Sequence, residues 1–204
     1  MLLFRSIDYL PRPTLMGLTP AAAMLAVWAL FEGTEPILAG RPVQPLWLAF
    51  VTYFSLTLAA RLPGLLARGR VSRGARAALW AALVLYVAAL VAGGFVADPR
   101  LLQLGWILGW LAYTALFVGT LLVFDAEDLA LMPYRWAIDH PFGREAMWIV
   151  AVRLSVVALA ATWAMTRGTL TEWVLFITLG RLFLFYVFEW ITILFALTWR
   201  DKGS

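Results

Sequence analysis

Three ionisable side chains lie inside long apolar segments of the chain, and their types allow them to do chemistry. They are Arg153, Arg181 and Glu189. A charged side chain near the centre of a bilayer is costly unless it is paired or hydrated, so such residues mark ion pairs, binding sites or transport paths. We therefore take these three as the candidate functional residues.

Arg153 and Glu189 are expected at matching depths in two neighbouring helices. The short connection near residues 167–171 makes these helices antiparallel neighbours. At about 1.5 Å per residue, Arg153 lies roughly 20 Å, and Glu189 roughly 25 Å, from the outer ends of their helices. The spacing predicts an intramembrane charge pair between them. The alternative is that each side chain extends separately to the cytoplasmic interface.

Arg181 lies roughly 13 Å from the outer end of the last expected helix. A guanidinium binds carboxylates and phosphates in a bidentate way. The position therefore predicts a contact with an anion or a lipid, such as a substrate anion, a lipid phosphate or a cofactor carboxylate. A carbonyl of a neighbouring subunit and capping within this chain are the alternatives.

A small-residue notch is expected on the helix that contains Gly105 and Gly109, beside a ridge formed by Trp106 and Trp110. Glycines four residues apart let the backbones of two membrane helices approach closely. The spacing predicts helix packing at Gly105 and Gly109. The packing partner is either another helix of this chain or a helix of a partner chain.

Aromatic residues are abundant, with 11 tryptophans and 13 phenylalanines. Their flat faces suit contact with a pigment, a quinone or a lipid, and the identity of any cofactor is left unknown. Indole also favours the boundary between water and lipid. Tryptophans near expected helix ends are therefore predicted to be interfacial anchors, namely Trp28, Trp47, Trp80, Trp148, Trp173 and Trp199.

One loop gathers His140, the single histidine, with five acidic residues: Asp125, Glu127, Asp128, Asp139 and Glu145. Their spacing matches no metal-binding or acid–base motif. The chain has no cysteine, which removes thiolate nucleophiles and thiolate metal sites. We predict no catalytic residue and no metal site, and we expect a protein that is not an enzyme.

The elements that position these residues are predicted to be membrane-spanning helices. Of the 204 residues, 63% are hydrophobic and only 14% are charged. The charges fall between apolar stretches that approach the roughly 20 residues needed to span hydrocarbon. The fold class is an all-α integral membrane protein, a single polytopic domain over residues 1–204 with about six transmembrane helices. The expected spans are about 14–32, 43–62, 75–97, 103–124, 146–166 and 172–199.

Two further segments are expected along the membrane surface. Residues 1–13 place apolar and charged side chains on different helical sides, which is typical of a short interfacial helix. Residues 125–145 mix acidic with large apolar side chains and contain Pro133 and Pro141. They are predicted to form an interfacial segment of a cytoplasmic loop.

The positive charges predict the orientation of the chain. With both termini in the cytoplasm, three arginines fall outside: Arg41, Arg100 and Arg167. The cytoplasmic side then holds Arg5, Arg12, Arg61, Arg68, Arg70, Arg73, Arg76, Arg135, Arg144, Arg200 and Lys202. This bias favours cytoplasmic termini in a multi-pass protein of the inner (cytoplasmic) membrane. Because the basic residues lie beside membrane segments, no nucleic-acid partner is predicted.

These observations favour a non-catalytic subunit that packs against and stabilises a larger membrane complex. An energy-converting complex, either respiratory or photosynthetic, is one candidate for it. The expected partners are the lipid bilayer and other membrane-protein subunits. A first alternative is a small transporter, or a substrate-binding transport component, that uses Arg181 and Glu189. A second is a lipid-processing enzyme at the cytoplasmic interface.

Overall fold

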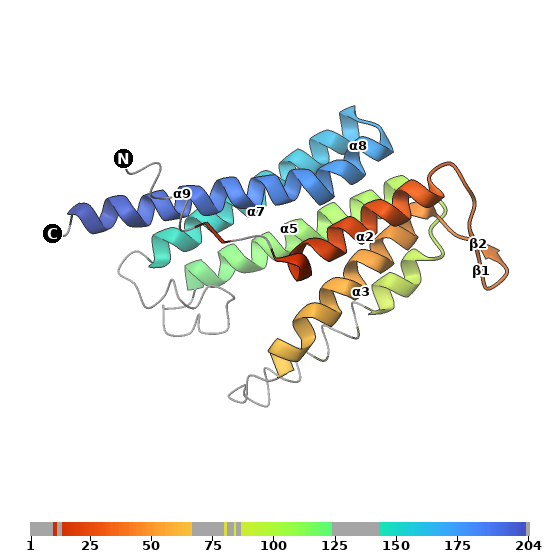
Figure 1. The fold of residues 1–204 in the computed structure, drawn as a ribbon, viewed down its shortest axis with the longest axis horizontal. Helices are drawn as coiled ribbons and strands as arrows, with labels where there is room; N and C mark the ends of the chain where they lie inside the picture. The colour runs from red at the N-terminus through yellow and green to blue at the C-terminus, as the bar shows by residue number, and fades with distance from the viewer. Residues whose placement is uncertain are drawn as a thin grey trace. The chain divides into compact units, whose positions relative to one another are not determined.

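Helices make up most of the structure, a computed structural model that describes residues 10–11, 14–66, 80, 84, 87–123 and 143–202 (Figure 1). The chain divides into two compact units. One takes residues 1–12 and 105–204, and the other takes residues 13–104. The division falls inside helix α5, Pro99–Val123, so α5 contributes residues to both units.

In the unit of residues 13–104, helix α2 (Leu15–Phe31) packs against helix α3 (Pro45–Leu66). The Thr14 side chain begins α2 by accepting a hydrogen bond of 3.2 Å from the backbone N–H of Gly17. The buried residues of both helices recur at spacings of three and four, which gathers them on one face of each helix. They are Ala21, Met24 and Trp28 in α2, and Leu46, Ala49 and Phe50 in α3.

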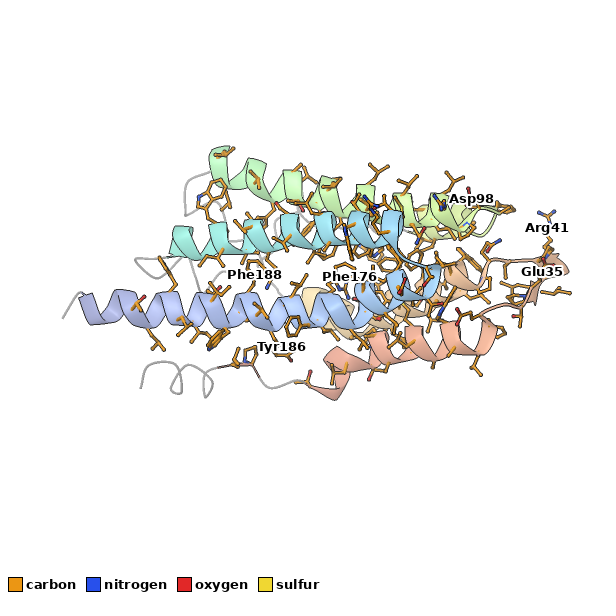
Figure 2. All side chains as sticks on the ribbon, turned by 90° about the horizontal axis from the view of Figure 1, so that it is seen from above. Glu35, Arg41, Asp98, Phe176, Tyr186 and Phe188 are labelled. Carbon is orange, nitrogen blue, oxygen red and sulfur yellow. The ribbon has the colours of Figure 1, made fainter. Side chains whose placement is uncertain are left out.

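A short hairpin connects α2 to α3. Strand β1 (Ile37–Leu38) pairs antiparallel with strand β2 (Arg41–Pro42). The two residues between them, Ala39 and Gly40, have φ values of 51° and 76°, the combination that a tight two-residue hairpin turn requires. The sequence predicts a turn-rich connection here, and the structure adds the two-residue ladder. Figure 2 shows Glu35 and Arg41 in this connection.

The segment before α5, which includes a helical stretch at residues 87–93, is held against the start of α3. The Trp47 indole donates to the Leu90 carbonyl at 2.7 Å, and the Gln44 side chain donates to the Ala97 carbonyl. Asp98, labelled in Figure 2, then caps α5 by accepting a hydrogen bond of 2.8 Å from the Arg100 backbone N–H. These bonds place the start of α5 at the same end of this unit as the hairpin.

In the unit that contains residues 105–204, α5 packs against α7 (Gly143–Arg167) through an apolar cluster. Its members are Phe117 and Leu121 of α5 with Met147, Val150, Ala151 and Leu154 of α7. Higher residue numbers in α5 meet lower numbers in α7, because Trp110 bonds to Leu154 while Phe117 and Leu121 share the cluster with Met147. The two helices are therefore antiparallel.

The turn after α7 contains a reciprocal helix cap. The backbone N–H of Thr169 donates to Glu172 Oε2 at 2.6 Å, and the backbone N–H of Glu172 donates to Thr169 Oγ1 at 3.2 Å. This capping box begins helix α8 (Leu170–Leu175). One π-helical turn, η2 (Phe176–Gly180), and helix α9 (Arg181–Lys202) continue the same rod. The rod packs antiparallel to α7.

Three segments of the described chain are long and apolar enough to cross a membrane: Pro99–Gly119, Met147–Arg167 and Leu170–Phe195. They lie within or close to the predicted spans at 103–124, 146–166 and 172–199. Shorter apolar helices cover Gly17–Phe31 and Pro45–Ala60. The prediction of a mostly helical protein is confirmed, and three of its helical segments have the length and apolar composition that a membrane span needs.

Several sequence predictions fall outside the described residues. The expected span at 75–97 is described only at residues 80, 84 and 87–97. The interfacial helix at 1–13 and the surface segment at 125–145 are described only at residues 10–11 and 143–145. The number of six spans, the surface segments, the single domain and the orientation therefore stay predictions.

Candidate functional site

Three tryptophans from two elements meet in the unit that contains residues 105–204. The rings of Trp106 and Trp110 stack at 5.4 Å between centroids, with an angle of 4° between their planes. The third indole, Trp173, meets Trp106 in a T-shaped arrangement, with 5.7 Å between the ring centroids and 82° between the planes. Trp106 and Trp110 are four residues apart, which places them on one face of α5. We call these three residues the indole cluster.

Hydrogen bonds to α7 fix two of these rings. Trp110 Nε1 donates to the Leu154 carbonyl at 3.0 Å, and Trp173 Nε1 donates to the Ala161 carbonyl at 3.1 Å. Trp173 is fully buried, with an exposed fraction of 0%. The indole N–H groups therefore hold the rings in place, and the ring faces are oriented before any further group arrives.

Arg181 reaches the indole cluster from the first position of α9. Its guanidinium carbon lies 5.7 Å from the centre of the Trp110 ring. This distance is within the range of an attractive cation–π interaction, which is stronger where water is excluded. The structure thus places the charge of Arg181, one of the three residues singled out from the sequence, over a fixed aromatic surface.

The π-helical turn η2 sets the position of Arg181. The backbone N–H of Arg181 donates to the carbonyls of Phe176 and Thr178. The ring of Phe176, labelled in Figure 2, lies over Gly180, where an added Cβ would come within 2.7 Å of it. A π-turn adds a residue to the helical repeat and rotates the residues that follow, and such turns are frequent at functional sites.

Arg153 and Glu189 form a second charged region. Arg153 is buried in α7, and its guanidinium carbon lies 4.9 Å from the centre of the Phe185 ring of α9. Its positive charge acts on the half-buried carboxyl group of Glu189. The structure therefore brings the two residues within electrostatic reach, and a direct ion pair between them stays a prediction. Figure 2 shows the neighbouring Tyr186 and Phe188 along the same stretch of α9.

The predicted packing glycines lie on an exposed part of α5. A Cβ built on Gly105 or Gly109 meets no atom within 4 Å in the described part of the chain. Exposed residues continue this face at Ala112 and Leu116. Helix packing at the two glycines stays a prediction, and no described residue supplies the second helix.

Among the described residues, no three histidine, cysteine, aspartate or glutamate side chains lie close enough together to hold a metal ion. His140 and the acidic residues Asp125, Glu127, Asp128 and Asp139 lie outside that part of the chain. Of the acidic loop, Glu145 alone enters a described element, as a residue of α7.

The fold and this site define a helical protein with apolar helices of membrane-spanning length. Comparison with family models, with curated proteins and with solved structures found no match.

Sequence reasoning missed the meeting of Arg181 with the indole cluster. It treated Trp106 and Trp110 as a packing ridge and Trp173 as an interfacial anchor, whereas the structure buries Trp173 completely. One signal was available: Thr169 and Glu172 have capping-box spacing, which places the start of the helix before Trp173 and so puts this residue inside the first turns.

Proposed function

We propose that this chain is a non-catalytic, multi-pass subunit of a larger complex in the inner membrane. Its helix α5 packs against a spanning helix of a partner subunit. The observation that carries this proposal is the exposed small-residue face of α5 at Gly105 and Gly109, which no described residue covers.

The proposed interface follows from the helical repeat. Gly105, Gly109, Ala112 and Leu116 are spaced by four, three and four residues, so they lie along one side of α5. All four are exposed, whereas the opposite side of α5 is buried, as at Thr114 and Leu121. The absence of side chains at the glycines gives acyl chains no additional favourable contact, whereas the backbone of another helix can approach α5 closely there. A protein helix therefore suits this surface better than acyl chains do.

A six-span topology with both termini in the cytoplasm is part of this proposal. It is supported by the alternating directions of α5, α7 and the α8–η2–α9 rod, since helix α7 is antiparallel to both of its neighbours. The excess of positive charge on the cytoplasmic side supports the orientation. Residues 75–97 supply the remaining span in this arrangement.

The experiment compares Gly109→Leu with the matched control Ala115→Leu. Both replace a small exposed residue of α5 by leucine, and the two positions are about 120° apart around the helix. Each tagged chain is purified from its native membrane in a mild detergent, and the co-purifying proteins are identified by mass spectrometry. We expect wild type and Ala115→Leu to retain the same membrane partners and Gly109→Leu to lose them.

Two results contradict this proposal. One is the same set of partners for Gly109→Leu and wild type. The other is a wild-type chain that elutes alone under conditions that preserve other membrane complexes.

A second candidate is a small transporter or a substrate-binding transport component. It is favoured by the presence of Arg181 and Glu189 in one apolar segment, Leu170–Phe195. Intramembrane charges of this kind commonly line ion or substrate paths. An Arg181→Gln variant that loses uptake while keeping all its protein partners supports transport, and retained uptake with lost partners supports the subunit proposal.

A further inference from the structure

The guanidinium of Arg181 and the indole cluster lie together at apolar depth, and this juxtaposition carries an inference independent of the subunit proposal. At about 1.5 Å per residue, Arg181 is roughly 16 Å along the rod from Leu170. It lies inside the candidate span Leu170–Phe195. We propose that Arg181, held over Trp110, binds the acidic head group of a membrane amphiphile, a carboxylate or phosphate ester carrying an alkyl chain.

The site is preorganised for a charged group. The Leu154 carbonyl fixes the Trp110 ring, and Trp106 stacks on that ring with nearly parallel planes. The π-turn η2 fixes the backbone of Arg181. Since none of these groups must be ordered again when a ligand arrives, binding loses little conformational entropy.

The chemistry of guanidinium selects the class of head group. A guanidinium carries its N–H donors in its own plane, whereas a neighbouring aromatic ring interacts with its face. Such a planar set of donors matches a pair of oxygens that lie in the same plane. Carboxylate and phosphate groups offer such oxygen pairs, and bonds between these groups and arginine are among the stronger hydrogen bonds in proteins.

The surroundings select an amphiphile over a free anion. Tyr113 of α5, whose ring lies 6.1 Å from the Trp110 ring, is exposed, and it belongs to the apolar segment Pro99–Gly119. A soluble anion would have to leave water and enter an apolar region, which is costly. An acid attached to an alkyl chain already lies in the membrane, and its chain can pack beside the exposed ring of Tyr113.

The test uses the full chain in detergent and 9,10-dibromostearic acid, whose bromine atoms quench nearby tryptophan fluorescence. The variants are Arg181→Gln, Arg181→Lys and the matched control Arg167→Gln, which removes an exposed arginine at the end of α7. We expect saturable quenching in wild type and Arg167→Gln. The affinity of Arg181→Gln should fall about tenfold or more, as the loss of a charge-assisted hydrogen-bonded pair implies. Arg181→Lys keeps the positive charge but lacks the paired planar donors of the guanidinium, so its affinity should lie between those of wild type and Arg181→Gln.

Two comparisons on the wild-type chain keep the proposal testable even if a variant fails to fold. The uncharged amide of the same brominated acid should bind about tenfold more weakly than the acid, because it lacks the negative charge. Inorganic phosphate should not displace the acid at matched concentration. Equal affinity of Arg181→Gln and wild type, equal binding of acid and amide, or displacement by phosphate alone overturns the proposal.

Discussion

The ring of Phe176 lies directly over Gly180, so close that a Cβ on this glycine would approach the ring to 2.7 Å. The two residues begin and end the π-helical turn that precedes Arg181. The missing side chain at Gly180 thus makes room for the ring, and this packing helps to hold the turn that positions Arg181.

We expect Gly180→Ala to destabilise the protein by about 1–3 kcal/mol, the usual cost of overpacking a filled site. Thermal unfolding in detergent, followed by circular dichroism, measures the loss. Gly119→Ala is the matched control, because a Cβ at Gly119 meets nothing within 4 Å in the described chain. In a Phe176→Ala background the cost of Gly180→Ala should largely disappear, and an unchanged cost in that background would show that the ring is not its cause.

Trp173 provides a second prediction, because it joins α8 to α7 with no exposed surface. Trp173→Ala should leave a cavity and cost about 1–3 kcal/mol. This is less than the roughly 3–5 kcal/mol seen in water-soluble cores, since lipid is as apolar as the protein interior. The control is Trp163→Ala, at a tryptophan of α7 that is 68% exposed. Equal unfolding temperatures for the two variants would contradict the buried role of Trp173.

The positions of most helices could be predicted from the sequence, because long apolar runs bounded by charges need only composition to be recognised. The expected spans at 103–124 and 146–166 lie close to Pro99–Val123 and Gly143–Arg167. Helix α5 begins four residues earlier than expected, since Asp98 and Pro99 supply a cap and a first-turn proline.

The candidate site could be predicted only in part. An arginine inside an apolar run is conspicuous, so Arg181 was found. Its neighbours were not, because the π-turn at Phe176–Gly180 rotates Arg181 relative to a regular helix, and an apolar pattern of uniform period carries no sign of this rotation. The burial of Trp173 likewise depends on packing against α7, which interfacial preference alone does not anticipate.

The interaction between Arg153 and Glu189 leads to a third prediction. Arg153→Gln and Glu189→Gln should each destabilise the chain, because each leaves the other charge in an apolar region. The double variant should cost less than the two single changes together, with a coupling of about 0.5–3 kcal/mol. Unfolding in detergent of the four proteins in the cycle gives the coupling directly. Strictly additive losses would mean that the two charges act separately.

The absence of cysteine makes the proposed orientation directly measurable, because any introduced cysteine is then the single thiol in the chain. Arg100→Cys and Thr169→Cys place a thiol at the exposed starts of α5 and α8, which the orientation assigns to the outside. Ser204→Cys places one at the chain end assigned to the cytoplasm. In intact cells, a membrane-impermeant maleimide should label the first two variants and spare the third until the membrane is opened.

Because α7 and α8 are joined by a two-residue turn, labelling of Thr169→Cys alone sets the direction of both helices. Labelling of both Thr169→Cys and Ser204→Cys in intact cells would mean an even number of crossings between residue 169 and residue 204, which contradicts the proposed topology. Labelling of Ser204→Cys with Thr169→Cys spared would mean a reversed orientation.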